Sequence, residues 1–132
     1  MNILILGAGR VGTASAIQLA SEQDNEVTVV DIDGGRLEKL SSKSDLRVVE
    51  GNASHPNVLK SAGAETADML IAVTSSDEVN MVSCQIVSTL FNTQTKIARI
   101  RQAEYTKHSE LFSEGDIPVD FILSPEELVT NY

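Results

Sequence analysis

Short apolar segments alternate with amphipathic segments along the chain. Six runs rich in aliphatic or β-branched residues predict β-strands, at residues 2–6, 26–33, 46–51, 67–74, 96–100 and 120–123. The segments between them predict helices, at residues 10–22, 35–43, 54–63, 76–91 and 104–114, and residues 124–129 begin another. Strands that alternate with helices in this way are typical of a parallel sheet with helices on both faces.

Two of the predicted helices carry additional signals. In the segment 54–63, Ser54 is a suitable N-cap, Pro56 suits the first turn and Gly63 suits the C-terminal end. The longest predicted helix, 76–91, has apolar residues that recur along one helical face, at Val79, Val82, Ile86 and Leu90.

The first strand ends in three closely spaced glycines, in the sequence GAGRVG. Gly7, Gly9 and Gly12 lie between a predicted strand and a predicted helix, and Asp31 follows at the end of the second strand. This context is the fingerprint of dinucleotide binding, whereas glycines without it would indicate only a tight turn. Gly7 would permit the turn, Gly9 would let the backbone approach a pyrophosphate, and Gly12 would let the helix pack closely. The phosphates would lie at the N–H groups of residues 9–12.

Asp31 has a separate expected role in the same fingerprint. Its carboxylate would accept hydrogen bonds from the adenosine ribose and would repel a ribose 2′-phosphate, which favours NAD(H) over NADP(H). Asp33, two residues on, is the better candidate for a solvated turn acid. Together these patterns predict an α/β fold, a Rossmann-type doubly wound parallel sheet of six strands with helices on both faces. A phosphate-binding Walker loop is excluded because Thr13, not lysine, follows Gly12.

Further motifs follow the later strands and narrow the interpretation. They are ASHP at 53–56, AGAETADMLIAVTSSDE at 62–78, N-x-x-x-C-Q at 80–85 and KIARIR at 96–101. With GAGRVG and VVDID, they resemble the RCK (or KTN) nucleotide-binding domain that regulates potassium transport. The resemblance covers nearly the whole chain.

The resemblance implies a set of nucleotide-binding residues. Gly7, Ala8, Gly9, Arg10 and Val11 would wrap the phosphates, and Asp31 would hold the ribose. Asn52 and Ala53 would flank the adenine, Thr74 and Ser75 would line the pocket near the phosphates or a second ribose, and Arg99 would approach the nucleotide. Glu126 occupies the place where some relatives bind a divalent cation. Many relatives have Gly-Asp where this chain has Gly51 and Asn52, which leaves the preference between NAD(H) and ATP or ADP open.

Several of these residues also have ordinary structural explanations. Thr74 and Ser75 are suitable caps for the following helix, and Asn52 is a common turn residue. Arg99 would also suit a surface ion pair, and Glu126 is a typical first-turn helix acid.

Composition limits the classes of partner. The chain has 132 residues, which fit a single domain spanning residues 1–132, expected to be the N-terminal part of a longer regulatory protein. The net charge of -9 argues against nucleic acid and against direct binding to acidic lipid. The N-terminus lacks the basic region of a signal peptide, so we expect a cytoplasmic protein. The only cysteine, Cys84, excludes an internal disulfide and is expected to be a buried, inert thiol.

Two functional hypotheses remain. The resemblance implies a regulatory subunit, a homo-oligomer (dimer or higher) docked on the inner face of the membrane through a potassium transporter or channel. The alternative is the cofactor domain of an NAD-dependent oxidoreductase, which needs a general acid or base. The sequence offers no recognised set of catalytic residues. A short-chain dehydrogenase would have a lysine four residues after its tyrosine, whereas Tyr105 is followed by Lys107. We therefore expect a protein without enzymatic activity.

Overall fold

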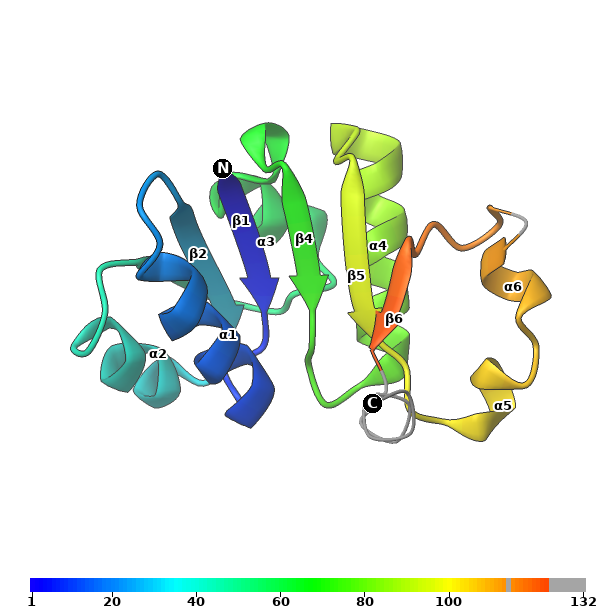
Figure 1. Cartoon of the computed structure of the whole chain (residues 1–132), viewed down its shortest axis with the longest axis horizontal. Helices are drawn as coiled ribbons and strands as arrows, with labels where there is room; N and C mark the ends of the chain where they lie inside the picture. The colour runs from blue at the N-terminus through cyan, green and yellow to red at the C-terminus, as the bar shows by residue number, and fades with distance from the viewer. Residues whose placement is uncertain (114, 124–132) are drawn as a thin grey trace.

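The computed structural model describes residues 1–113 and 115–123 of the chain (Figure 1). Its parallel sheet is built from β1 (Asn2–Leu6), β2 (Glu26–Asp31), β3 (Arg47–Glu50), β4 (Met69–Ala72), β5 (Thr95–Arg99) and β6 (Phe121–Leu123). The strand order β3-β2-β1-β4-β5-β6 is that of the doubly wound dinucleotide-binding fold. The six-stranded parallel sheet predicted from the sequence is therefore confirmed.

Helices cover both faces of the sheet. On one face lie α1 (Arg10–Ala20) and α2 (Gly34–Ser41), and on the other lie α3 (Pro56–Ser61) and α4 (Asp77–Phe91), as Figure 1 shows. A single 3₁₀ turn, η1 (Ala64–Thr66), follows α3. The short helices α5 (Ala103–Thr106) and α6 (Glu110–Ser113) lie beside β6, in the connection between β5 and β6.

The hydrophobic core has two layers because successive strand residues point to opposite faces. Between the sheet and helices α1 and α2 lie residues such as Ile5, Val29, Leu37 and Leu40. Between the sheet and helices α3 and α4 lie residues such as Leu6, Val30, Leu59, Leu70 and Val87. Burial on both faces explains why the strands are almost continuously apolar in the sequence.

Cys84 lies in the second of these layers, on the sheet-facing side of α4. Its side chain is completely buried, and this burial raises the pKa of the thiol to about 12. The charges of Lys96 and Asp120 have smaller and opposing effects on that pKa. The expectation of a buried thiol is confirmed.

The start of α3 differs from the sequence prediction. His55, not Ser54, occupies the N-cap, and its side chain makes no capping hydrogen bond. Ser54 is unavailable because its backbone N–H and its hydroxyl both donate to Oδ1 of Asn52, at 2.9 and 2.7 Å. The other two signals hold: Pro56 begins the helix, and Gly63 follows it in the left-handed region at φ +89°.

The helix predicted for residues 104–114 is also corrected. The chain forms two separate turns, α5 and α6, with Lys107, His108 and Ser109 between them. His and Ser are weak helix formers, and few apolar residues in this segment bury against the sheet. Helical packing therefore does not compensate for the local preference.

Of the four apolar residues predicted to form one face of α4, Val79 and Ile86 are partly buried and pack against the core, whereas Val82 and Leu90 lie on the exposed side. Val82 and Leu90 are 46% and 57% exposed. The side that faces the sheet instead carries Asn80, Cys84 and Val87, all completely buried. Within the described residues, no helix combines the length and apolarity needed to span a bilayer.

We expect the two leucines of these contrasting environments to respond differently to truncation. Leu70→Ala, at a completely buried site on β4, should lower the free energy of unfolding by about 2–5 kcal/mol. Leu90→Ala, on the exposed side of α4, should change it by less than about 0.5 kcal/mol. Urea unfolding followed by circular dichroism measures both values, and similar losses for the two variants would contradict the placement of α4.

Candidate functional site

A cavity of about 290 Å³ opens where the carboxyl ends of the strands meet. The chain turns away from the sheet in opposite directions after β1 and after β4, which are neighbours in the sheet, so this is the switch point of the fold. Ligands of open α/β sheets bind in the crevice at this position. Of the residues predicted from the sequence, the cavity lining contains Gly7, Gly9, Arg10, Asp31, Asn52, Ala53, Thr74, Ser75 and Arg99.

The glycine loop between β1 and α1 needs glycine at two positions, Gly7 because of its backbone conformation and Gly12 because of a close backbone contact. Gly7 has φ +107°, a conformation that disfavours other residues, and its N–H donates to the Val30 carbonyl at 2.8 Å. A Cβ on Gly12 would overlap the carbonyl oxygen of Gly7. Both residues are therefore required by the turn itself. A Cβ on Gly9 would meet nothing within 4 Å, so this glycine leaves room on the cavity side.

The first turn of α1 presents backbone N–H groups without a capping side chain. Gly9 is the N-cap and has no side chain to accept from them, and the first backbone bond runs from Thr13 N to Gly9 O at 2.9 Å. The initial N–H groups of a helix have no partner within it. Together with the helix dipole, they form a place that favours an anion.

Asp31 is tied to the glycine loop. Its Oδ2 accepts from the Ala8 N–H at 2.6 Å, and its Oδ1 accepts from the Asp33 N–H at 2.8 Å. Asp33 is the exposed acid: its side chain caps α2 by accepting from Gly35 N and Arg36 N. Asp31 thus has a structural role that the sequence did not reveal. Each of its oxygens retains capacity for a second donor, such as a ribose hydroxyl.

Asn52 and Ala53 follow β3 and border the cavity. Oδ1 of Asn52 forms the turn with Ser54 described above, so Asn52 is both a turn residue and a lining residue. The Ala53 carbonyl accepts from the hydroxyl of Ser83 on α4, at 2.9 Å. This contact holds the loop after β3 against the buried side of α4.

Thr74 and Ser75 line the cavity but do not cap α4. The N-cap is Ser76, whose Oγ accepts from the Val79 N–H at 3.1 Å. Thr74 is bound instead to Asn80: its N–H and its hydroxyl both donate to Asn80 Oδ1, at 2.9 and 2.7 Å. The sequence could not distinguish the neighbouring hydroxyl residues as caps, because all three are suitable cap residues.

Arg99 brings a cation to the cavity from the end of β5. Its Nη2 donates to the Thr74 carbonyl at 3.2 Å, and its Nε is buried without a hydrogen-bond partner among the described residues. Burial, and next the neighbouring Arg101, lowers the pKa of the guanidinium below its usual value, whereas Asp77 acts in the opposite direction. Within the described part of the chain Arg99 has no carboxylate partner within ion-pair distance, which argues against the surface ion pair. A bound anion would supply the missing partner.

The lining also contains residues that were not among the predicted nucleotide-binding residues: Val30, Ile32, Arg36, Gly51, Val73, Ser76 and Val79. Ile32, 74% exposed, lies at the rim directly after Asp31, and Val79 adds another apolar side chain. Arg36 also lines the cavity and pairs with Asp33 at 3.7 Å. The sequence placed Ile32 inside the predicted strand 26–33, so its exposure just beyond β2 became apparent only in the structure.

Some predicted residues lie off the lining. Ala8, Val11 and Gly12 belong to the loop and the first turn of α1 but do not border the cavity themselves. Among residues 1–113 and 115–123, no three His, Cys, Asp or Glu side chains are grouped to hold a metal ion. Glu126, the candidate metal ligand, lies outside the described residues.

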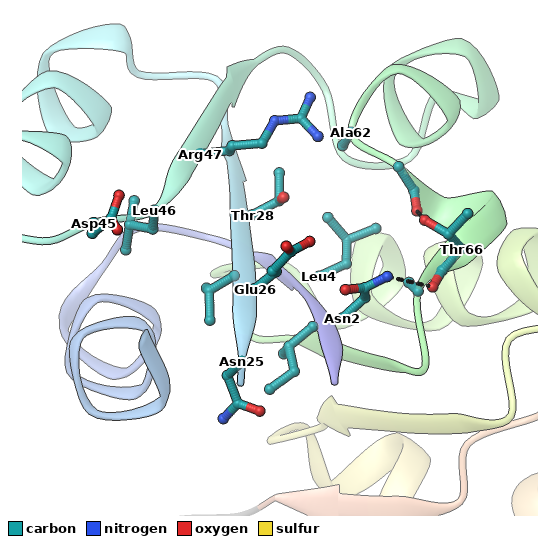
Figure 2. A pocket seen from close by; sticks show the side chains of 14 residues that line it. Asn2, Leu4, Asn25, Glu26, Thr28, Asp45, Leu46, Arg47, Ala62 and Thr66 are labelled. Atoms are coloured by element: carbon teal, nitrogen blue, oxygen red, sulfur yellow. Dashed lines mark hydrogen bonds between the residues drawn. The ribbon is translucent and has the colours of Figure 1, made fainter. Parts of the chain in front are cut away.

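A second cavity, of about 370 Å³, lies at the opposite ends of β1, β2 and β3 (Figure 2). Its charged lining residues, including Glu26 and Arg47, are exposed. The amide of Asn2 donates to the Thr66 carbonyl at 3.1 Å. None of the predicted nucleotide-binding residues borders this cavity among the described residues, and the cavity lies away from the switch point.

Comparison with known proteins gives a family match along most of the chain. The family described as the TrkA-N domain matches residues 3–125. The chain is 56% identical, over 133 aligned residues, to the "Trk system potassium uptake protein TrkA" of Vibrio alginolyticus. The alignment covers 100% of this chain but 29% of that relative, so the chain spans less than a third of its length.

Solved structures with low sequence identity share the fold. The TrkA-N domain of the inner membrane protein ybaL from Escherichia coli has a TM-score of 0.82 at 20% identity, over 98% of this chain and 91% of that one. The GsuK channel bound to NAD has a TM-score of 0.74 at 24% identity, over 92% of this chain and 21% of that one. GsuK bound to ADP has a TM-score of 0.78 at 23% identity, over 99% and 33%. These likenesses agree with the predicted Rossmann-type fold.

The geometry of the glycine loop predicts a clear difference between two alanine substitutions. Gly12→Ala should destabilise the chain strongly, by about 3 kcal/mol or more, because the new methyl group overlaps the Gly7 carbonyl. Gly9→Ala should change the free energy of unfolding by less than about 1 kcal/mol, because its methyl group meets only open space. Thermal and urea unfolding of both variants provide the comparison, and a strongly destabilised Gly9→Ala would contradict this loop geometry.

Proposed function

The chain belongs to the TrkA-N domain family, and on this premise we propose that it is a nucleotide-binding regulatory domain. The cavity at the carboxyl ends of the strands binds an adenine nucleotide, NAD(H) or alternatively ADP or ATP. The bound nucleotide controls a potassium uptake transporter or channel. Residues 1–132 act as a single domain in this role.

One observation carries the proposal. A single cavity is bordered by the start of α1, whose first turn has no capping side chain, by the carboxylate of Asp31, and by Arg99, which has no ion-pair partner among the described residues. A nucleotide diphosphate linked to a ribose satisfies all three, since the phosphates need donors and the ribose hydroxyls need an acceptor. A turn that was merely structural would account for Asp31, which binds the Ala8 N–H, but not for Arg99 at the same cavity.

The adenosine fits the side of the cavity formed by β2 and β3. Its ribose hydroxyls would donate to Asp31, and its ring would pack on the exposed side chain of Ile32. Covering this isoleucine removes apolar area from water. Asn52 would meet the ring edge as a donor through its Nδ2, unlike the aspartate of many relatives, because its Oδ1 already accepts two hydrogen bonds from Ser54.

The proposal commits to the adenosine diphosphate moiety that NAD(H), ADP and ATP share. The negative charge of Asp31 would repel a 2′-phosphate, so NADP(H) is disfavoured. GsuK structures bound to NAD and to ADP support both ligand types as candidates.

A regulatory role is favoured over an enzymatic one. Among the described residues, the cavity is lined by no His, Cys, Lys or Tyr, and both oxygens of Asp31 already accept backbone N–H groups. Tyr105, the one tyrosine weighed as a catalytic group, donates its hydroxyl to Glu78 at 2.6 Å. Binding without chemistry would act by shifting the population of two arrangements of the protein.

The names of the relatives support a membrane partner. Vibrio alginolyticus TrkA is named as part of a potassium uptake system, and GsuK is a channel. We therefore place this domain in the cytoplasm, in a homo-oligomer that reaches the inner face of the membrane through its transporter. Neither nucleic acid nor lipid is a direct partner, in keeping with the net charge of -9.

Calorimetric titration with NADH, NAD, ADP, ATP and NADPH tests the proposal. We expect binding of at least one of the first four ligands and weaker binding of NADPH than of NADH. Gly9→Ala should fold normally yet weaken the binding by about tenfold or more, because its methyl group occupies the space beside the phosphates.

Gly9→Ala is a sharper probe than a substitution of Asp31. Removal of the Asp31 carboxylate also frees the Ala8 N–H and disturbs the loop, so lost binding would have two explanations. If none of the four nucleotides binds the folded chain, the proposal is wrong. If NADPH binds as tightly as NADH, the role given to Asp31 is wrong.

A further inference from the structure

Asn80 is a completely buried polar residue on the sheet-facing side of α4. Its Oδ1 accepts from the N–H and the hydroxyl of Thr74, as described above. Its Nδ2 donates to the Thr74 carbonyl at 3.2 Å and to the Arg99 carbonyl at 2.8 Å. One amide therefore joins the loop after β4 to the end of β5, with its full hydrogen-bonding capacity used.

These bonds hold Arg99 at two points. The first is its own backbone carbonyl, which Asn80 binds directly. The second is the Thr74 carbonyl, which accepts from both Asn80 Nδ2 and Arg99 Nη2. The guanidinium is thus attached to an oxygen whose position Asn80 fixes, while its buried Nε has no partner among the described residues.

Neighbouring residues of α4 hold the other loops of the cavity in the same way. Oδ2 of Asp77 accepts from the N–H groups of Arg101 and Gln102, at 3.0 and 2.8 Å. Ser83 binds the Ala53 carbonyl, as noted above. Asp77, Asn80 and Ser83 are spaced three residues apart, so they share the buried side of the helix. Of the three, only Asn80 contacts both Thr74 and Arg99.

We propose that Asn80 is a positioning residue of the nucleotide site, which orients the Arg99 guanidinium toward the phosphates before the ligand arrives. The inference rests on the proposed function and deepens it. The Thr74 N–H is already bound to Asn80 and is therefore not free to bind a phosphate. The phosphates are met here by Arg99, and an oriented cation binds without the cost of being ordered.

The test compares ADP with adenosine, which lacks phosphates, on four proteins: the unaltered chain, Asn80→Ala, Arg99→Ala and the double variant. Arg99→Ala should weaken ADP binding by about tenfold or more, since it removes a charge-assisted hydrogen bond. Asn80→Ala should weaken ADP binding by a similar factor. It should change adenosine binding by less than about threefold, which is half of the free-energy change that a tenfold loss represents. The double variant should bind ADP no more weakly than Arg99→Ala, because Asn80 acts through Arg99.

Gln85→Ala is the matched control for the loss of a side-chain amide from α4. Gln85 is exposed, and within the described part of the chain its amide donates only to Thr89 Oγ1, at 2.8 Å, away from the cavity. It should bind ADP and adenosine like the unaltered chain. Asn80→Leu is the second variant, since it fills the volume of Asn80 without a hydrogen-bonding group and separates lost hydrogen bonds from a cavity.

A second readout requires no ligand. In the ¹⁵N-correlated NMR spectrum, Nε–H of Arg99 should give a signal protected from solvent exchange in the unaltered chain. It should lose that protection in folded Asn80→Ala or Asn80→Leu. A merely structural role would lower stability without moving this signal or the ratio of ADP to adenosine affinity.

The outcomes separate the two proposals. If the unaltered chain binds neither ADP nor adenosine, the proposed function fails for this ligand class, and the Arg99 signal still decides whether Asn80 orients the side chain. If ADP binds but Asn80→Ala loses ADP and adenosine equally, the positioning role is wrong. Additive effects of Asn80→Ala and Arg99→Ala would also overturn it.

Discussion

In a parallel sheet all strands end on the same side, and the peptide groups that follow them are no longer hydrogen-bonded within the sheet. These groups need other hydrogen-bond partners. In this chain, side chains supply them. Asp31 binds the glycine loop, Asn80 binds the loop after β4, and Asp77 binds the segment after β5. The cavity is bounded by loops held in this way. Its shape therefore depends on a few polar side chains as much as on the apolar core beneath them.

The polar groups that these side chains do not bind define the chemistry of the site. The first turn of α1 has no capping side chain, and Nε of Arg99 has no partner among the described residues. Both features favour negative charge at the same cavity, in a chain whose net charge is strongly negative. Under the proposed function, the attraction for an anion would be local and would arise from backbone groups and Arg99 rather than from overall charge.

The sheet, its six strands and the glycine loop could be predicted because they depend on local signals. Apolar runs and the conformational demands of Gly7 and Gly12 are properties of short segments. The contacts that assemble the site are not. The sequence could not show that Asn52 captures Ser54 and moves the helix start to His55, or that Ser76 rather than Thr74 caps α4. Each depends on which of several suitable side chains reaches a given backbone group.

The orientation of α4 gives the clearest physical reason for these limits. Of its apolar residues that follow a helical period, Val79 and Ile86 pack partly against the core, but Val82 and Leu90 lie on the exposed side. The buried side carries Met81, Cys84 and Val87 together with the polar residues Asp77, Asn80 and Ser83. These three bind peptide groups of the segments after β5, β4 and β3. A pattern based on hydrophobicity alone cannot include these hydrogen bonds. Nine of the predicted binding residues line the cavity, but how they are held could not be anticipated.

The burial of Cys84 makes the chain suitable for site-specific labelling. Maleimides react with the thiolate form, which is scarce at neutral pH for a buried thiol whose pKa is raised to about 12. Because the chain contains no other cysteine, we expect its folded form to react with such reagents as slowly as a protein without cysteine. A cysteine introduced in place of an exposed residue would then carry a fluorophore at one defined position. The native thiol, packed against the sheet, would not need to be removed first.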